Sequence, residues 1–176
     1  ELRRKLLLHE IDFVVILQPT NLNPQIYVED IIHTDQLTAF MCDKNPLAKK
    51  ERITWKDLNH ADLAIFGETF MIHHQLMKQF ELQDIKPNIV LRSTLWDFLL
   101  ESTRNTSSIT ILPSPIRNHI RWDNIVEKQF ENPIHWHVVL AYPQKAHYNR
   151  IERYVRKSAM DHFVHNKKIK PINQSE

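Results

Sequence analysis

Thr69 and Thr94 are the residues whose type and position point most directly to ligand binding. Each follows an apolar run that predicts a strand and precedes a stretch with helical spacing. At the start of a helix, unpaired N–H groups and the positive end of the helix dipole favour an anion. The same threonines could instead serve only as helix caps. Arg92, next to Ser93 and Thr94, could pair with a carboxylate or face solvent.

Other reactive side chains in the sequence favour structural roles. His73 and His74 are adjacent, so both cannot face one ion from a helix, and neither a cysteine pair nor an H-E-x-x-H motif accompanies the 11 histidines. Cys42 is the only cysteine, which excludes an internal disulfide and favours a buried, unreactive thiol. Glu68 is the only acid expected near a ligand, and one carboxylate is not an acid–base mechanism. We therefore predict no catalytic residue, no metal and no cofactor.

The composition excludes several large function classes. Gly67 is the only glycine among 176 residues, where average usage predicts roughly twelve. A P-loop, a dinucleotide fingerprint and a nucleophile elbow each need at least two glycines. No apolar run is long enough to cross a membrane. The sequence therefore predicts an ordinary globular domain.

The net charge of +2 is unevenly distributed along the chain. Residues 145–170 hold eight Lys and Arg against two acids. A basic end of this kind could contact nucleic acid, but a solvated helix face followed by a loose tail is the interpretation we favour.

Strands and helices are expected to alternate along the chain. Apolar runs predict strands at Asp12–Leu17, Gln36–Cys42, Leu63–Phe66, Asn88–Arg92, Ile109–Leu112 and Trp136–Tyr142. Helical spacing predicts helices over Leu2–Leu8, from about Thr69, after Ser93-Thr94 and near the C-terminus. This alternation indicates an α/β fold with largely parallel sheets.

The ends and faces of the helices can also be predicted. Thr94 with Asp97 three residues later has the spacing of a capping box, and Asn105 could end that helix in the left-handed conformation. The last helix is expected to bury one apolar face. Its members are Ile151, Tyr154, Val155, Ala159 and Phe163.

The order of the elements predicts two lobes. A middle segment with three strand–helix steps is entered through one strand and left through another, as in a two-lobed binding fold with a ligand cleft. We predict lobe I at 1–35 and 140–165, lobe II at 43–133, hinge strands at 36–42 and 134–142, and a loose tail at 166–176.

Four segments, in order and with matching spacing, resemble one family. Leu6–Val15 is similar to an L-x-x-G-x-L-D-x-x-I segment, Asn45–Ala48 to H-P-L-A, Ile53–Leu58 to v-x-x-x-D-L, and Ser108–Pro113 to G-x-G-I-A-L-L-P. Over about 1 to 165 the chain resembles the effector-binding (regulatory) domain of LysR-type transcriptional regulators. It departs from the family at His9 and across 104–108, where glycines are usual.

The resemblance implies a two-lobed fold like that of type II periplasmic binding proteins, with a small organic effector, an anion by our interpretation, between the lobes. It implies effector contacts at the ends of predicted strands, and Arg92 is added because it could pair with a carboxylate. The candidate effector residues are Gln18, Pro19, Thr20, Phe66, Gly67, Glu68, Thr69, Phe70, Arg92, Ser93, Thr94 and Pro113. It also implies homodimers or homotetramers in the cytoplasm, no membrane partner, and DNA binding only through an N-terminal domain absent from this chain. Because the chain opens with Glu1, we expect it to lack the first elements of lobe I as well.

Two alternatives share the predicted fold. A solute-binding protein of a transporter would require an export signal upstream. An enzyme would need at least two acids or bases in the cleft, and Glu68 alone does not meet this requirement.

Overall fold

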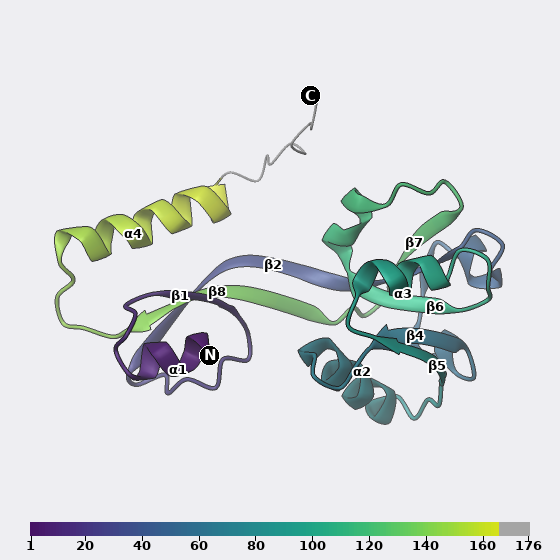
Figure 1. The fold of residues 1–176 in the computed structure, drawn as a ribbon, viewed down its shortest axis with the longest axis horizontal. Coiled ribbons are helices and arrows are strands. Elements are labelled where there is room, and N and C mark those ends of the chain that lie inside the picture. The colour runs from purple at the N-terminus through teal and green to yellow at the C-terminus, as the bar shows by residue number, and fades with distance from the viewer. Residues whose placement is uncertain (166–176) are drawn as a thin grey trace. The chain divides into compact units, whose positions relative to one another are not determined.

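The structure is a computed structural model that describes residues 1–165, and the tail predicted as loose at 166–176 lies outside the described residues. The chain forms two compact units (Figure 1). Unit 1 consists of Glu1–Asp35 and the segment that starts at His135, and unit 2 is Gln36–Ile134. Among residues 1–165, no helix has both the length and the apolar character needed to cross a bilayer.

Unit 1 is built around a pair of antiparallel strands. β1 (Val14–Leu17) pairs with β8 (His135–Pro143), in register from Val14 opposite Ala141 to Leu17 opposite Val138. Helix α1 (Leu2–Leu7) buries Leu6 against this pair, and α4 (Arg150–Met160) follows β8. The strand predicted at Asp12–Leu17 was expected to belong to a largely parallel sheet. That expectation is wrong, because β1 runs antiparallel to β8 and leaves Val15 and Leu17 exposed.

A single strand, β2 (Tyr27–Cys42), continues from unit 1 into unit 2. The sequence predicted only its second half, Gln36–Cys42, where consecutive residues are apolar and buried. Its first half carries charged residues such as Glu29 and Asp30, which interrupt the apolar pattern while the backbone remains extended.

Unit 2 contains a mixed sheet. β4 (Asp62–Phe66) runs parallel to β5 (Asn88–Ser93) and to β6 (Ile109–Pro113). β2 runs antiparallel to β6 and to β7 (Ile125–Phe130), and the short β3 (Arg52–Ile53) runs parallel to β7. The expectation of largely parallel sheets therefore holds for β4, β5 and β6 but not for the sheet as a whole.

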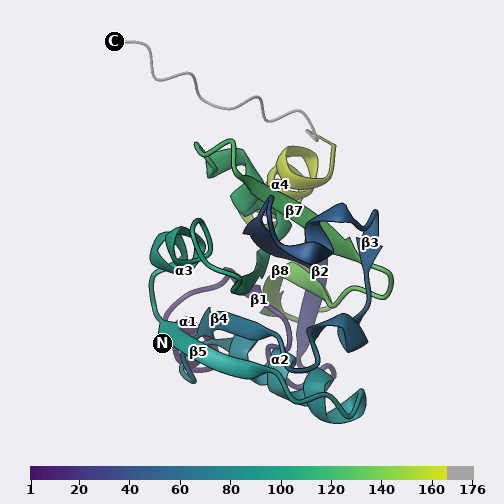
Figure 2. The ribbon, with the colours of Figure 1, turned by 90° about the vertical axis from the view of Figure 1, so that its right-hand side faces the viewer.

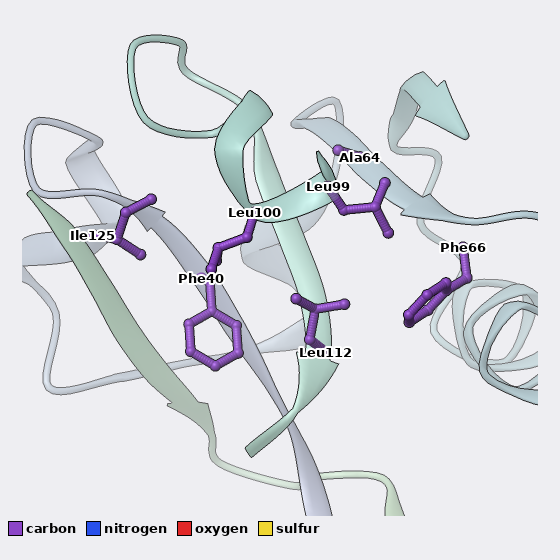
Figure 3. Close-up of a cluster of buried hydrophobic side chains, with 7 residues drawn as sticks. All are labelled: Phe40, Ala64, Phe66, Leu99, Leu100, Leu112 and Ile125. Atoms are coloured by element: carbon purple, nitrogen blue, oxygen red, sulfur yellow. The ribbon is translucent and has the colours of Figure 1, made fainter. Parts of the chain in front are cut away.

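Helices α2 (Met71–Leu82) and α3 (Trp96–Ser102) lie on opposite sides of β4 and β5 (Figure 2). Alternate residues of β4 point to opposite faces of the sheet. On the α3 side, Ala64 and Phe66 pack with Leu99 and Leu100 (Figure 3). That cluster is completed by Phe40, Leu112 and Ile125. This cluster in the core of unit 2 is therefore apolar and draws on four strands and one helix.

The helix starts differ from the predicted ones. α2 begins at Met71 with Phe70 in the capping position, and α3 begins at Trp96 with Leu95 there; neither start has a side-chain cap. Thr69 and Thr94 are therefore not helix caps, and the predicted Thr94–Asp97 capping box does not form. Asn105 does not adopt the left-handed conformation either.

His9 shows how this chain manages without a family glycine. Its φ of 55° lies in the left-handed region that favours glycine. Position 9 is one of the places where the family normally has glycine. The backbone at this position therefore has a conformation that favours glycine, although the residue here is histidine.

The buried face predicted for the last helix is wrong at Ile151, Tyr154 and Phe163, which are exposed, whereas Val155 and Ala159 are half-buried. Ile151 and Tyr154 are 73% and 70% exposed, whereas the buried residue of α4 is Glu152. Glu152 is held by a capping box with Asn149 and by Lys145 Nζ, which lies 2.6 Å from its Oε1. The hydrogen bond from Lys145 lowers the pKa of the Glu152 carboxyl, so burial of this acid is compensated by two donors.

Candidate functional site

In unit 1 the candidate residues meet on an acid that the sequence analysis did not identify. Gln18 and Thr20 follow β1, and the Gln18 N–H donates to the His137 carbonyl of β8 at 3.0 Å. Gln18 Nε2 donates to Glu29 Oε2 at 2.7 Å, and the Thr20 hydroxyl donates to Glu29 Oε1. Both oxygens of the Glu29 carboxylate therefore accept a hydrogen bond from a predicted site residue.

Thr20 is the most firmly held residue of this cluster. Its side chain is buried, and its oxygen also accepts from the Leu22 N–H at 3.2 Å. Pro19 stands between the two donors and is exposed. No motif marks Glu29 in the sequence; only its place on an extended strand beside β8 could have pointed to it.

In unit 2 the predicted residues lie where β4 and β5 end. The Gly67 N–H donates to the Ser93 carbonyl at 3.1 Å, and the Phe70 N–H donates to the Gly67 carbonyl at 3.1 Å. The Phe66 and Phe70 rings stack with their centroids 4.6 Å apart. The structure thus brings Phe66, Gly67, Phe70 and Ser93 together, through backbone hydrogen bonds and ring contact rather than through polar side chains.

The remaining predicted residues of unit 2 surround this group. Glu68, Thr69, Arg92 and Thr94 are exposed, and Pro113 is half-buried at the end of β6. Ser93 Oγ is already used, because it accepts from the Leu95 N–H at 3.0 Å. Exposed hydroxyls and one guanidinium are therefore available here to hydrogen-bond a ligand.

Gly67 occupies open space. It does not have a positive φ, and a Cβ added to it would meet no atom within 4 Å. The fold does not require glycine at this position. The absence of a side chain leaves room beside the ends of β4 and β5.

His73 and His74 have different environments. His73 is buried and its Nδ1 donates to the Phe66 carbonyl at 2.9 Å, whereas His74 is exposed. His73 thereby ties α2 to the end of β4. Among residues 1–165, no three or more His, Cys, Asp and Glu side chains are grouped so that they could hold a metal ion.

A second polar cluster in unit 1 supports the strands rather than presenting groups to a ligand. Asp30 Oδ2 accepts from the Tyr142 hydroxyl at 2.7 Å and pairs with Arg156 of α4 at 3.4 Å. Burial raises the pKa of the Tyr142 hydroxyl, and the bond to Asp30 raises it further. The Arg156 guanidinium lies over the rings of Tyr142 and Tyr148, 4.7 and 5.1 Å from their centroids.

The sequence and the fold of this chain both match one family. The sequence matches the LysR substrate binding domain family over residues 1–162. The chain belongs to this family, the effector-binding domains of LysR-type transcriptional regulators, and the resemblance in the sequence is confirmed.

Solved structures of the family share the fold. The effector-binding domain of QuiR in complex with shikimate has a TM-score of 0.70 and 16% identity, over 92% of this chain and 76% of that one. The CcmR regulatory domain from Synechocystis PCC6803, in complex with 2-PG, has a TM-score of 0.74 and 13% identity, over 93% and 78%. The predicted two-lobed fold, like that of type II periplasmic binding proteins, is confirmed.

A relative in sequence is an uncharacterized HTH-type transcriptional regulator, YwbI of Bacillus subtilis (strain 168). It is 23% identical over 163 residues, which are 89% of this chain and 50% of the relative. The chain thus spans about half the length of this curated relative.

Proposed function

We propose that this domain senses a small organic acid bearing at least one hydroxyl or amino group. The observation that carries the proposal is Glu29, whose carboxylate is held by Gln18 and Thr20. A fixed carboxylate attracts hydrogen-bond donors and repels a bare anion. The effector groups next to Glu29 are therefore hydroxyls or an ammonium. The class of effector is thus narrower than the organic anion expected from the sequence, because it also carries hydrogen-bond donors.

The acidic group of the effector binds in unit 2. Arg92 supplies a positive charge there, and the Thr69 and Thr94 hydroxyls are exposed. An acid with hydroxyl groups has both a carboxylate that can pair with Arg92 and donors that Glu29 can accept. Shikimate, found with the QuiR domain, belongs to this chemical class, which supports the proposal.

The proposed role is regulation rather than catalysis. A bound effector shifts the domain towards one arrangement of its lobes only if it binds that arrangement more tightly than the other. The segments 36–42 and 134–142 act as the hinge strands. The domain acts in the cytoplasm, in a homodimer or homotetramer, and relays binding to a DNA-binding domain that lies outside this chain. The alternative is a transporter's solute-binding protein, which an export signal in the upstream coding sequence would reveal.

Substitution of Glu29 tests the effector class. A thermal-shift screen would use organic acids in matched pairs, with and without hydroxyl groups, including shikimate and cyclohex-1-ene-1-carboxylate. We expect the acids that stabilise the domain to be the hydroxylated members. Glu29→Gln should weaken their binding about tenfold or more, the usual effect of losing a charged hydrogen-bond partner.

Glu51→Gln is the matched control, since Glu51 is an exposed acid that is not among the candidate effector residues. The proposed class of effector, hydroxylated organic acids, would be refuted if both members of each pair bound equally well. This result would have to hold for both the wild type and Glu29→Gln.

Thr94→Val tests the half of the site in unit 2. Because Thr94 does not cap α3, this substitution should leave the melting temperature nearly unchanged while weakening effector binding. A fall in stability of ~1 kcal/mol without a change in binding would instead show a structural role for Thr94.

A further inference from the structure

Unit 2 contains a pocket that none of the candidate effector residues lines. Its volume is about 430 Å³, within the range of small-molecule sites. Its walls come from two segments, the turn after β2 at 42–46 and the loop after α3 at 104–107, together with Asn124. All of these belong to one compact unit.

Two asparagines hold the two walls together. Asn45 Nδ2 donates to the Ser107 carbonyl at 2.8 Å, and Asn124 Nδ2 donates to the Arg104 carbonyl at 3.0 Å. Asn45 is buried, and its Oδ1 also accepts from the Leu47 N–H at 2.9 Å. The shape of the pocket is therefore set by the protein before any ligand binds.

The loop at 104–107 lies where the family normally has glycines. Here Thr106 Oγ1 donates to the Ser102 carbonyl at 2.8 Å and lies 2.6 Å from Ser108 Oγ. Hydroxyl groups of Thr106 and Ser108 thus help to hold this loop. They also make this wall more polar than a glycine loop would be.

The charged groups of the pocket are two cations and one acid. Within residues 1–165, Lys44 forms no ion pair, so its charge remains available to a ligand. Arg104 donates through Nη1 to Glu101 at 2.8 Å, while its Nε is buried without a hydrogen-bond partner. The Arg104 guanidinium is fixed over the Trp122 ring, 5.0 Å from its centroid. Asp43 is the acid, and its Oδ1 accepts from the Cys42 thiol at 3.3 Å.

The pocket lies at the opposite end of β6 from the effector residues. β6 starts at Ile109, directly after the pocket loop, and ends at Pro113. Four residue steps along a strand cover about 13 Å. β4 and β5 run parallel to β6, so Gly67 and Ser93 lie towards the far end of the sheet. One small ligand cannot occupy both places.

We propose that this pocket binds the oxyanion group of a small metabolite, a carboxylate or a phosphate, through Lys44 and Arg104. Lys44, whose charge has no ion-pair partner among residues 1–165, and the Arg104 guanidinium both line the pocket, which favours an anion. The regulator domain would then respond to two ligands at separate sites.

Titration of the ¹⁵N-labelled chain with inorganic phosphate, and separately with citrate, tests the proposal at constant ionic strength. We expect saturable shifts of backbone amide signals at 43–45 and 105–107. Lys44→Gln should weaken this binding about tenfold, because a charge-assisted hydrogen bond is lost. The ion that binds more tightly tells whether phosphate or carboxylate is the preferred group.

Lys49→Gln is the matched control, since Lys49 is an exposed neighbour outside the pocket and should leave the affinity unchanged. Three results would overturn the proposal: shifts that never saturate with either ion, shifts confined to 67–70 and 93–94, or the same affinity in Lys44→Gln as in wild type.

Discussion

Units 1 and 2 position their candidate effector residues by different means. In unit 1, polar side chains converge on buried or half-buried acids: Gln18 and Thr20 on Glu29, and Tyr142 and Arg156 on Asp30. In unit 2, the corresponding residues are held by backbone hydrogen bonds at strand ends, above an apolar core. Unit 1 should therefore be sensitive to the loss of single polar groups, and unit 2 to the loss of apolar volume.

The largest effect is expected from truncation of the core of unit 2. Leu112→Ala removes a side chain that is 0% exposed, which should lower the free energy of unfolding by about 2–5 kcal/mol in urea denaturation. Leu82→Ala is the matched control, because Leu82 is 68% exposed and should change stability by less than about 0.5 kcal/mol. Equal effects of the two substitutions would contradict an apolar basis for unit 2.

A smaller loss is expected when one hydroxyl is removed from unit 1. Tyr142→Phe deletes the donor to Asp30 while keeping the buried ring, which should cost about 1.5–3 kcal/mol of unfolding free energy. Tyr154→Phe makes the same change at a residue that is 70% exposed and should be neutral. If Tyr142→Phe were equally neutral in urea denaturation, the polar cluster would not stabilise unit 1.

The smallest effect on stability is expected at Asp57, a charged residue that stabilises unit 2. Asp57 accepts from Lys50 Nζ at 2.7 Å and from the Thr54 N–H at 2.8 Å. Partial burial opposes ionisation, but these donors together lower the pKa of its carboxyl below the ordinary 3.8. Since the folded-state pKa is the lower one, the stabilisation is fully present above 3.8 and is lost as the pH falls through the lowered pKa.

Asp57→Asn should therefore cost less than about 1 kcal/mol at neutral pH and nothing in strong acid, as measured by urea denaturation across the pH range. Asp123→Asn, at an exposed acid, provides the comparison. A cost for Asp57→Asn that persists in acid would mean that the charge is not its cause.

The apolar strands could be predicted from the sequence, whereas the direction of their partners could not. Leu63–Phe66 and Ile109–Leu112 are continuous buried runs, and each is a strand in the structure. An apolar run indicates that a strand is buried but not whether its partner is parallel or antiparallel. The antiparallel pairing of β1 with β8 was therefore not predicted. The first half of β2 was missed because its charged residues find partners within the fold.

The candidate site was predictable at the level of segments. The ends of β4 and β5 follow from where apolar runs stop, and the structure brings Gly67 and Ser93 together there. The helix starts were predicted wrongly, because Phe70 and Leu95 rather than Thr69 and Thr94 occupy the capping positions. Phe70 also stacks on Phe66 at the end of β4. Glu29 was not predictable, because its role depends on a contact with Thr20 across a turn that no local pattern specifies.

Unit 2 is inserted into the sequence of unit 1, and this has a consequence for synthesis of the chain. The backbone enters and leaves unit 2 at neighbouring points, where the Leu37 N–H donates to the Ile134 carbonyl at 2.9 Å. β1 leaves the ribosome early, yet its partner β8 is made only after all of Gln36–Ile134. Unit 2 can therefore fold before β1 finds its partner strand. In pulsed hydrogen exchange during refolding, the amides of β6 should become protected before those of β1.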